Sequence, residues 1–102
     1  MPKKTFAAKS RTCRVTFELP AEGALESAFL CGDFNDWALD ANPLTRRKDG
    51  RFSTTITLDA GKQYRYRFWV DGARWENDWE ADAYVPNGFG GEDSLLDLSE
   101  SL

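Results

Sequence analysis

An alternating run of aromatic and basic residues, from Gln63 to Trp75, carries the side chains best suited to ligand chemistry in this sequence. Arg65, Arg67 and Trp69 alternate with apolar residues and share one face of the run. A guanidinium group donates hydrogen bonds in a fixed fork, and an indole ring offers a large, rigid apolar face. A face that mixes arginine with tryptophan indicates contact with a partner, because a face that served only the core would be apolar throughout.

A strand and a hairpin turn must position these groups. The alternation predicts a strand over residues 63–70 that is buried on one side. Its apolar face comprises Tyr64, Tyr66, Phe68 and Val70. Asp71-Gly72 then gives a strong hairpin signal, since glycine accepts a positive φ and aspartate tolerates one. We therefore expect Arg74 and Trp75 to lie beside the strand that they have just left.

Length, charge and hydropathy narrow the class of protein. The chain has 102 residues, enough for one domain, and 14% of them are aromatic. Its net charge of −4 argues against nucleic acid, because phosphate binding requires a basic surface. No stretch approaches the roughly 20 apolar residues of a membrane span, and the N-terminus lacks the apolar segment of a secretory signal. We expect a cytoplasmic monomer that contacts neither nucleic acid nor membrane.

Cysteine and histidine content limits metal and catalytic chemistry. Cys13 and Cys31 fall in separate predicted strands, so we expect two free, mostly buried thiols, which suit a reducing compartment. Without histidine, soft ligands are too few for a zinc site. The alternating acids Asp78, Glu80 and Asp82 lack both the spacing of a calcium loop and the cleft of a glycosidase. We expect no metal, no cofactor and no enzyme activity.

Short strands separated by turn signals make up the rest of the chain. Besides residues 63–70, the predicted strands are 14–19, 27–32, 52–58 and 95–98. We predict a flexible basic arm at residues 1–12, with an edge extension as the alternative, then a domain at 13–98 and a tail at 99–102. The pattern predicts an all-β fold, an antiparallel immunoglobulin-like β-sandwich.

Two loops are expected to present functional groups at the ends of these strands. Residues 32–37, Gly-Asp-Phe-Asn-Asp-Trp, are rich in side chains that bond their own backbone, which predicts a structured loop with Trp37 at its tip. Residues 76–91 show no clean period and are expected to form one long loop, with Trp79 as a candidate core anchor. A loop of that length in a compact domain is usually functional.

Several motifs follow one another in an order that resembles the family-48 carbohydrate-binding modules. They are Gly32–Trp37, Leu44-Thr45, Tyr66–Gly72, Trp75, Asn77-Asp78 and Gly90–Leu96. That family includes the glycogen-binding domain of the AMP-activated protein kinase β subunit and the N-terminal early-set domains of isoamylase and glycogen branching enzyme. The resemblance covers residues 14–98, and it implies an early-set β-sandwich that binds α-1,4-linked glucan.

The resemblance also implies a set of sugar contacts. Trp37 and Trp75 match the two tryptophans that stack on sugar rings. Arg67 falls where a lysine usually contacts hydroxyl groups, Phe89 matches a leucine that reaches into the glucan ring, and Asp93 replaces an asparagine that bonds hydroxyls. The chemistry is consistent with these roles, because a glucose ring presents a flat C–H patch to an indole face.

The leading interpretation is noncatalytic binding of glycogen, starch or maltooligosaccharide by exposed tryptophans. The alternative is a protein-interaction or assembly domain of the same fold that binds no sugar and docks a glycogen-metabolising enzyme or another protein. Exposed Trp37 and Trp75 would favour sugar, whereas buried indoles would favour the alternative. Arg67 has an alternative of its own, as a solvated residue paired with nearby acids.

Overall fold

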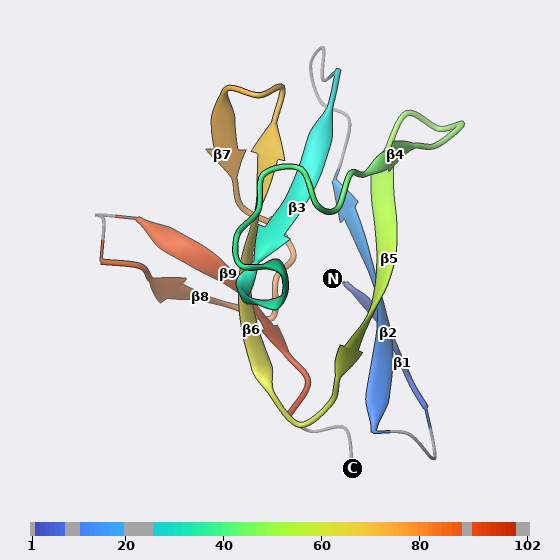
Figure 1. Cartoon of the computed structure of the whole chain (residues 1–102), viewed down its shortest axis with the longest axis vertical. Helices are drawn as coiled ribbons and strands as arrows, with labels where there is room; N and C mark the ends of the chain where they lie inside the picture. Colours follow the sequence, from blue (N-terminus) through green and yellow to red (C-terminus); the bar gives the residue numbers. More distant parts are fainter. Residues whose placement is uncertain (1, 8–10, 20–25, 89–90, 100–102) are drawn as a thin grey trace.

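The computed structural model describes residues 2–7, 11–19, 26–88 and 91–99, and these residues form two antiparallel sheets that face each other across one core (Figure 1). In spatial order, sheet A consists of β1 (Lys3–Phe6), β2 (Thr12–Leu19), β5 (Phe52–Asp59) and β4 (Thr45–Arg46). Sheet B consists of β3 (Ala28–Gly32), β6 (Gln63–Val70), β9 (Glu92–Asp97) and β8 (Ala83–Pro86), with β7 (Arg74–Glu76) also paired to β6. The predicted antiparallel, immunoglobulin-like β-sandwich is confirmed.

Strand β6 organises sheet B because three strands pair with it. β3 lies along one side, from Ala28 opposite Val70 to Gly32 opposite Tyr66. On the other side β9 pairs with the first half of β6 and β7 with the second half, which places Trp75 directly opposite Trp69. The predicted hairpin therefore forms at residues 71–73.

Alternating apolar residues from both sheets fill the core. The fully buried members are Cys13, Val15, Phe17, Leu30, Tyr66, Phe68, Val70, Leu96 and Leu98. Phe17 of sheet A meets Tyr66 of sheet B edge to face, with ring centroids 4.9 Å apart. Pairs of this geometry stabilise a core by about 1 kcal/mol beyond simple burial. The apolar face predicted for residues 63–70 is confirmed, because Tyr66, Phe68 and Val70 are fully buried and Tyr64 is half-buried.

Residues 3–6 form an edge strand, which was the alternative to the flexible arm predicted at residues 1–12. Lys3–Phe6 pair antiparallel with β2, from Lys3 opposite Thr16 to Phe6 opposite Cys13. The Lys4 ammonium also donates to the Asp82 carboxylate at 2.7 Å and to the Asp97 carbonyl at 3.1 Å. Periodicity missed this strand because most of its side chains are exposed, so no apolar alternation marks it.

The long loop predicted at residues 76–91 is also interrupted by a strand. Ala83–Pro86 form β8, which pairs with β9 from Ala83 opposite Leu95 to Pro86 opposite Glu92. β8 is an edge strand with mostly exposed side chains, and its last residue is a proline, which an edge tolerates. The hairpin of β8 and β9 extends to one side of the sandwich in Figure 1.

The cysteines and the helical content agree with the sequence. Cys13 lies in sheet A and Cys31 in sheet B, and both thiols are free and fully buried. The only helical element in the described part of the chain is the 3-10 turn η1 (Asp33–Asn35). No helix among the described residues is long and apolar enough to cross a membrane.

Candidate functional site

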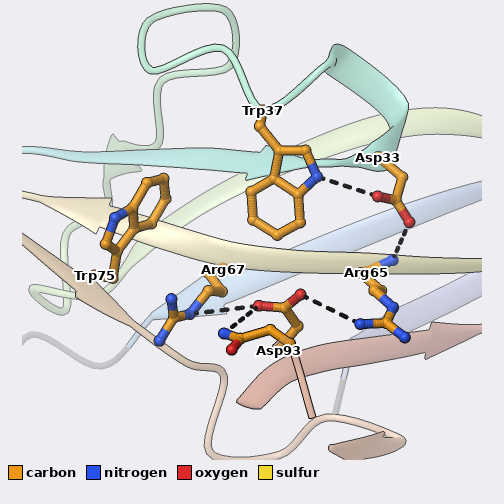
Figure 2. A pocket seen from close by; sticks show the side chains of 7 residues that line it. Asp33, Trp37, Arg65, Arg67, Trp75 and Asp93 are labelled. Atoms are coloured by element: carbon orange, nitrogen blue, oxygen red, sulfur yellow. Dashed lines mark hydrogen bonds and ion pairs between the residues drawn. The ribbon is translucent and has the colours of Figure 1, made fainter. Parts of the chain in front are cut away.

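A hollow on the outer face of sheet B brings together most of the residues singled out in the sequence. Arg65 and Arg67 alternate along β6 with the fully buried Tyr66 and Phe68, so their side chains lie on that outer face. The hollow has a volume of about 360 Å³. Its lining consists of Asp33, Trp37, Arg65, Arg67, Trp75, Asn87 and Asp93 (Figure 2).

One wall of the hollow is the turn that follows β3. Asp36 and Trp37 have φ angles of 56° and 59°, a left-handed conformation that is uncommon outside glycine. Several bonds hold this turn: the Trp37 amide donates to the Gly32 carbonyl at 2.9 Å, and the Gly32 amide donates to the Asn35 side chain at 3.0 Å. Asn35 in turn donates to the Leu30 carbonyl at 2.9 Å. The backbone therefore fixes the direction in which Trp37 leaves the sheet.

Gly32 allows this turn to lie close against β6. A Cβ atom at this position would lie 2.5 Å from the Arg65 carbonyl oxygen and 2.8 Å from the Phe34 ring. No side chain fits in that space without moving the backbone, which explains why a glycine opens the Gly-Asp-Phe-Asn-Asp-Trp motif.

Asp33 ties the turn wall to the strand beneath it. One of its carboxylate oxygens accepts a hydrogen bond from the Trp37 indole N–H at 3.1 Å, and the other accepts the Arg65 amide at 2.9 Å. Both bonds are drawn in Figure 2. With its N–H already bonded to protein, Trp37 offers a ligand its ring face alone. Asp33 was not predicted as a site residue, although it follows directly after Gly32.

The second wall is Trp75, which β7 places next to Trp37. Their ring centroids are 6.1 Å apart and the ring planes meet at 75°. Trp69 supports Trp75 from its cross-strand position, with centroids 4.8 Å apart. Trp75 is 37% exposed and Trp37 is half-buried, so neither indole belongs to the core.

The floor of the hollow is a cluster of charged groups centred on Asp93. This carboxylate is buried and lies 3.8 Å from the nearest nitrogen of both Arg65 and Arg67. It also accepts a hydrogen bond from the Asn87 side chain at 3.3 Å. The Arg67 guanidinium lies 5.8 Å from the centre of the Trp75 ring, within cation–π range. The floor therefore holds fixed donors and acceptors side by side beneath two aromatic walls.

One hydrogen-bond donor of Arg67 forms no bond to the described residues. Its Nε is buried and has no hydrogen-bond partner in the described part of the chain, since the nearest carboxylate oxygen of Asp93 is 3.8 Å away. A buried donor left unpaired costs about 1–3 kcal/mol. A hydroxyl group bound in the hollow would relieve that penalty.

Four of the five predicted site residues meet in this hollow: Trp37, Arg67, Trp75 and Asp93. The fifth, Phe89, lies outside the described residues. The sequence pointed to Arg65 only as a neighbour of Arg67 on the same face. Asn87 lies in a segment whose pattern gave no signal.

Most of the chain, including both tryptophan walls of the hollow, matches a known protein family. A family model described as the glycogen recognition site of AMP-activated protein kinase matches residues 13–92. The chain belongs to this glycogen-recognition family. No curated protein matches it. The match runs from β2 to the first residue of β9 and includes both tryptophan walls, so family membership indicates noncatalytic recognition of glycogen or a related glucan.

Two of the alternating acids of this glycogen-recognition domain, Asp78 and Asp82, serve as structural acceptors. Asp78 accepts the Tyr66 hydroxyl at 2.6 Å, and burial beside that carboxylate raises the pKa of Tyr66 above its usual range. Asp82 accepts the Lys4 ammonium and the Asp97 amide. No group of three His, Cys, Asp or Glu side chains among the described residues could hold a metal ion.

Proposed function

We propose that this chain binds α-1,4-linked glucan, as glycogen, starch or maltooligosaccharide, by stacking glucose rings on Trp37 and Trp75 without catalysis. The observation that carries the proposal is the pair of solvent-accessible indoles, 6.1 Å apart and inclined at 75°, above a floor of arginine and carboxylate groups. Few surfaces other than a sugar chain present flat apolar patches and dense hydroxyl groups together.

The inclination of the two rings suits a curved chain. Successive rings of an α-1,4-glucan turn relative to one another, so two indoles set at an angle can each meet one sugar face. Trp37 enters this arrangement already oriented, because Asp33 holds its N–H. Pre-orientation reduces the entropy lost on binding.

The polar floor would bond the edges of the stacked sugars. Arg67 donates, and its unpaired Nε gives a hydroxyl oxygen a place to bind. Asp93 accepts from a hydroxyl, and its position between Arg65 and Arg67 keeps both guanidinium groups at the site. Phe89 is proposed to add an apolar contact, as the family resemblance implies.

Buried indoles at Trp37 and Trp75 would favour the alternative, a protein-interaction domain that binds no sugar. Both are at least partly exposed, which favours sugar. We further propose that the chain works in the cytoplasm as a monomer, because its two free thiols suit a reducing compartment. There it would bring a glucan to a glycogen-metabolising enzyme.

A titration of the 15N-labelled protein with maltoheptaose tests the proposal. We expect saturable shifts of the Trp37 and Trp75 indole signals and of the Arg67 and Asp93 amides. Trp37→Ala and Trp75→Ala should each weaken binding roughly tenfold or more, because each removes one stacking face. Phe6→Ala is the matched control, since Phe6 is also an exposed aromatic residue but lies in sheet A.

Two outcomes of the titration would overturn the proposal that the chain binds α-1,4-linked glucan. One is the absence of any shift at millimolar maltoheptaose. The other is equal binding of cellohexaose, whose β-1,4 links give a straight chain, because the inclined rings should discriminate between the two. The first outcome would move the assignment to a protein-interaction domain.

A further inference from the structure

Trp79 is the most exposed of the large apolar side chains in the described residues, at 65%, against 46% for Leu39, the next most exposed. Trp79 was a candidate core anchor in the sequence, and its exposure shows that it does not anchor the segment in the core. Its ring lines a second cavity of about 390 Å³ together with Glu18, Arg51, Asp78 and Glu80. This cavity shares no lining residue with the hollow on sheet B.

The backbone that carries Trp79 is firmly held, so the exposure of the ring does not come from a loose segment. The preceding residue, Asp78, is buried, and its amide donates to the Ser94 hydroxyl at 2.9 Å. Its carboxylate accepts the Tyr66 hydroxyl and the Glu80 amide, and its carbonyl accepts the Tyr84 hydroxyl at 2.5 Å. Bonds on both sides of Trp79 thus fix the chain while the indole stays in solvent.

The other groups in the cavity come from sheet A. Glu18 lies on the outward side of β2, between the buried Phe17 and Leu19. Arg51 precedes β5, and its side chain is 60% exposed, with the Asp49 carboxylate 3.9 Å from its Nε. An exposed indole, a guanidinium and a buried aspartate therefore occur together here, as they do in the first hollow.

The cavity lining carries one guanidinium, Arg51, and three carboxylates, Glu18, Asp78 and Glu80. Arg51 opposes a cation, and the Asp78 carboxylate is already bonded to the Tyr66 hydroxyl and the Glu80 amide. Glu18 and Glu80 oppose an anion such as a phosphate. A hydroxylated ring with an apolar face fits all the groups present, because it stacks on the indole, accepts from the guanidinium and donates to the carboxylate.

We propose that Trp79 and its cavity form a second saccharide contact, at which a glucose unit of an α-glucan stacks on the indole and bonds Arg51 and Glu18. This inference rests on the proposed function in that it takes the same ligand class. A short oligosaccharide would occupy the two contacts independently. A branched polymer such as glycogen offers many chain ends, so it can engage both contacts of one domain and bind more tightly than either contact alone.

The four tryptophan indole signals of the 15N-labelled full chain, titrated with maltoheptaose, separate the two sites. We expect the Trp79 signal to shift with a saturation curve of its own, distinct from that of Trp37 and Trp75. Shifts of the Trp37 and Trp75 signals without a shift of the Trp79 signal would overturn the second contact and leave the proposed function intact. A shift at Trp79 alone would sustain the second contact and overturn the role of the first, and no shift at any indole would overturn both.

Variants then test the polymer prediction. Trp79→Ala should lower the apparent affinity for glycogen about tenfold through lost multivalency, while maltoheptaose affinity at Trp37 and the thermal unfolding midpoint stay at the native values. Trp79→Phe should retain part of the affinity. Phe6→Ala changes another exposed aromatic residue and should leave the apparent affinity for glycogen at the native value. Native glycogen affinity in Trp79→Ala, or an equal loss in Phe6→Ala, would overturn the proposal.

Discussion

The two walls of the sheet B hollow are held in place by different means. The strand wall consists of Trp75 with the adjoining floor residues Arg65 and Arg67, and these residues project from β6 and β7, where the register of the ladder sets the direction of every side chain. Trp37 projects from a short turn with two left-handed residues, and its position depends on a few individual hydrogen bonds and on one glycine. Many ladder hydrogen bonds therefore hold the strand wall, so the loss of one leaves its side chains in place. A single substitution can displace the turn wall, because only a few bonds and one glycine hold it.

The largest effect is expected at Gly32, where the two walls meet. Gly32→Ala should lower the free energy of unfolding by about 3 kcal/mol, because the new Cβ would overlap the Arg65 carbonyl and the Phe34 ring. Glucan binding should be lost as Trp37 moves away. Urea unfolding and the maltoheptaose titration measure the two effects.

Gly72→Ala in the hairpin of the strand wall is the matched control. Gly72 has a φ of 63° but open space around it, so alanine there should cost only about 1 kcal/mol of backbone strain. Binding should persist, since the register of β6 with β7 remains. Equal losses of stability in the two variants would contradict the view that the turn wall is the more fragile.

A smaller effect is expected from Asp33, which touches both walls. Asp33→Ala removes the acceptors of the Trp37 indole and the Arg65 amide, and each such bond contributes about 1 kcal/mol. We expect a modest loss of stability and roughly tenfold weaker binding, because Trp37 becomes free to choose other rotamers. Asp33→Asn, which keeps one acceptor, should fall between Asp33→Ala and the native protein. Native affinity in Asp33→Ala would show that Trp37 needs no positioning.

Both walls could be predicted from the sequence, but the bonds that hold the turn wall against the sheet could not. Alternation placed Arg67 on the outer face and the Asp-Gly turn placed Trp75 beside the strand that precedes it, because both follow from the local period and turn chemistry. The contact of Asp33 with Arg65 joins residues 32 positions apart, and no local pattern encodes it. Asn87 was missed for a related reason, since β8 beside it is an edge strand without apolar alternation.

A charge-conserving change in the strand wall should have a still smaller effect. Arg67→Lys keeps a cation above Asp93 but loses the planar fork and the buried Nε donor. We expect about threefold weaker maltoheptaose binding, with an unfolding midpoint within error of the native value. A loss as large as that of Trp75→Ala would mean that the arginine, and not the indole, dominates binding.

The smallest effect concerns the thiols, which report local opening of the two sheets. Burial raises the pKa of Cys31 from 9.0 to about 11, and it also raises the pKa of Cys13. The folded state thus favours the neutral thiol, so this contribution to stability is complete below pH 9 and is lost as the pH rises to about 11. At pH 8 both thiols should react slowly with a disulfide reagent.

The turn variants make this reaction a test of the comparison. Asp33→Ala should speed the labelling of Cys31, which lies in β3 directly before the turn, more than that of Cys13 in sheet A. Cys31→Ser provides the control for assigning each rate. Equal acceleration at both thiols would indicate global unfolding instead of local opening of the turn wall.

The order of strands in sheet B bears on how the chain is made. β9 is the last of the described strands along the chain, yet it lies between β6 and β8, and the core includes Leu96 of β9 and Leu98 just after it. The Asp97 carbonyl also accepts a hydrogen bond from Lys4, near the start of the chain. During synthesis the sandwich therefore cannot close until β9 has left the ribosome, and a nascent chain that stalled before residue 92 would expose the edge of β6 and lack Leu96 and Leu98 in its core.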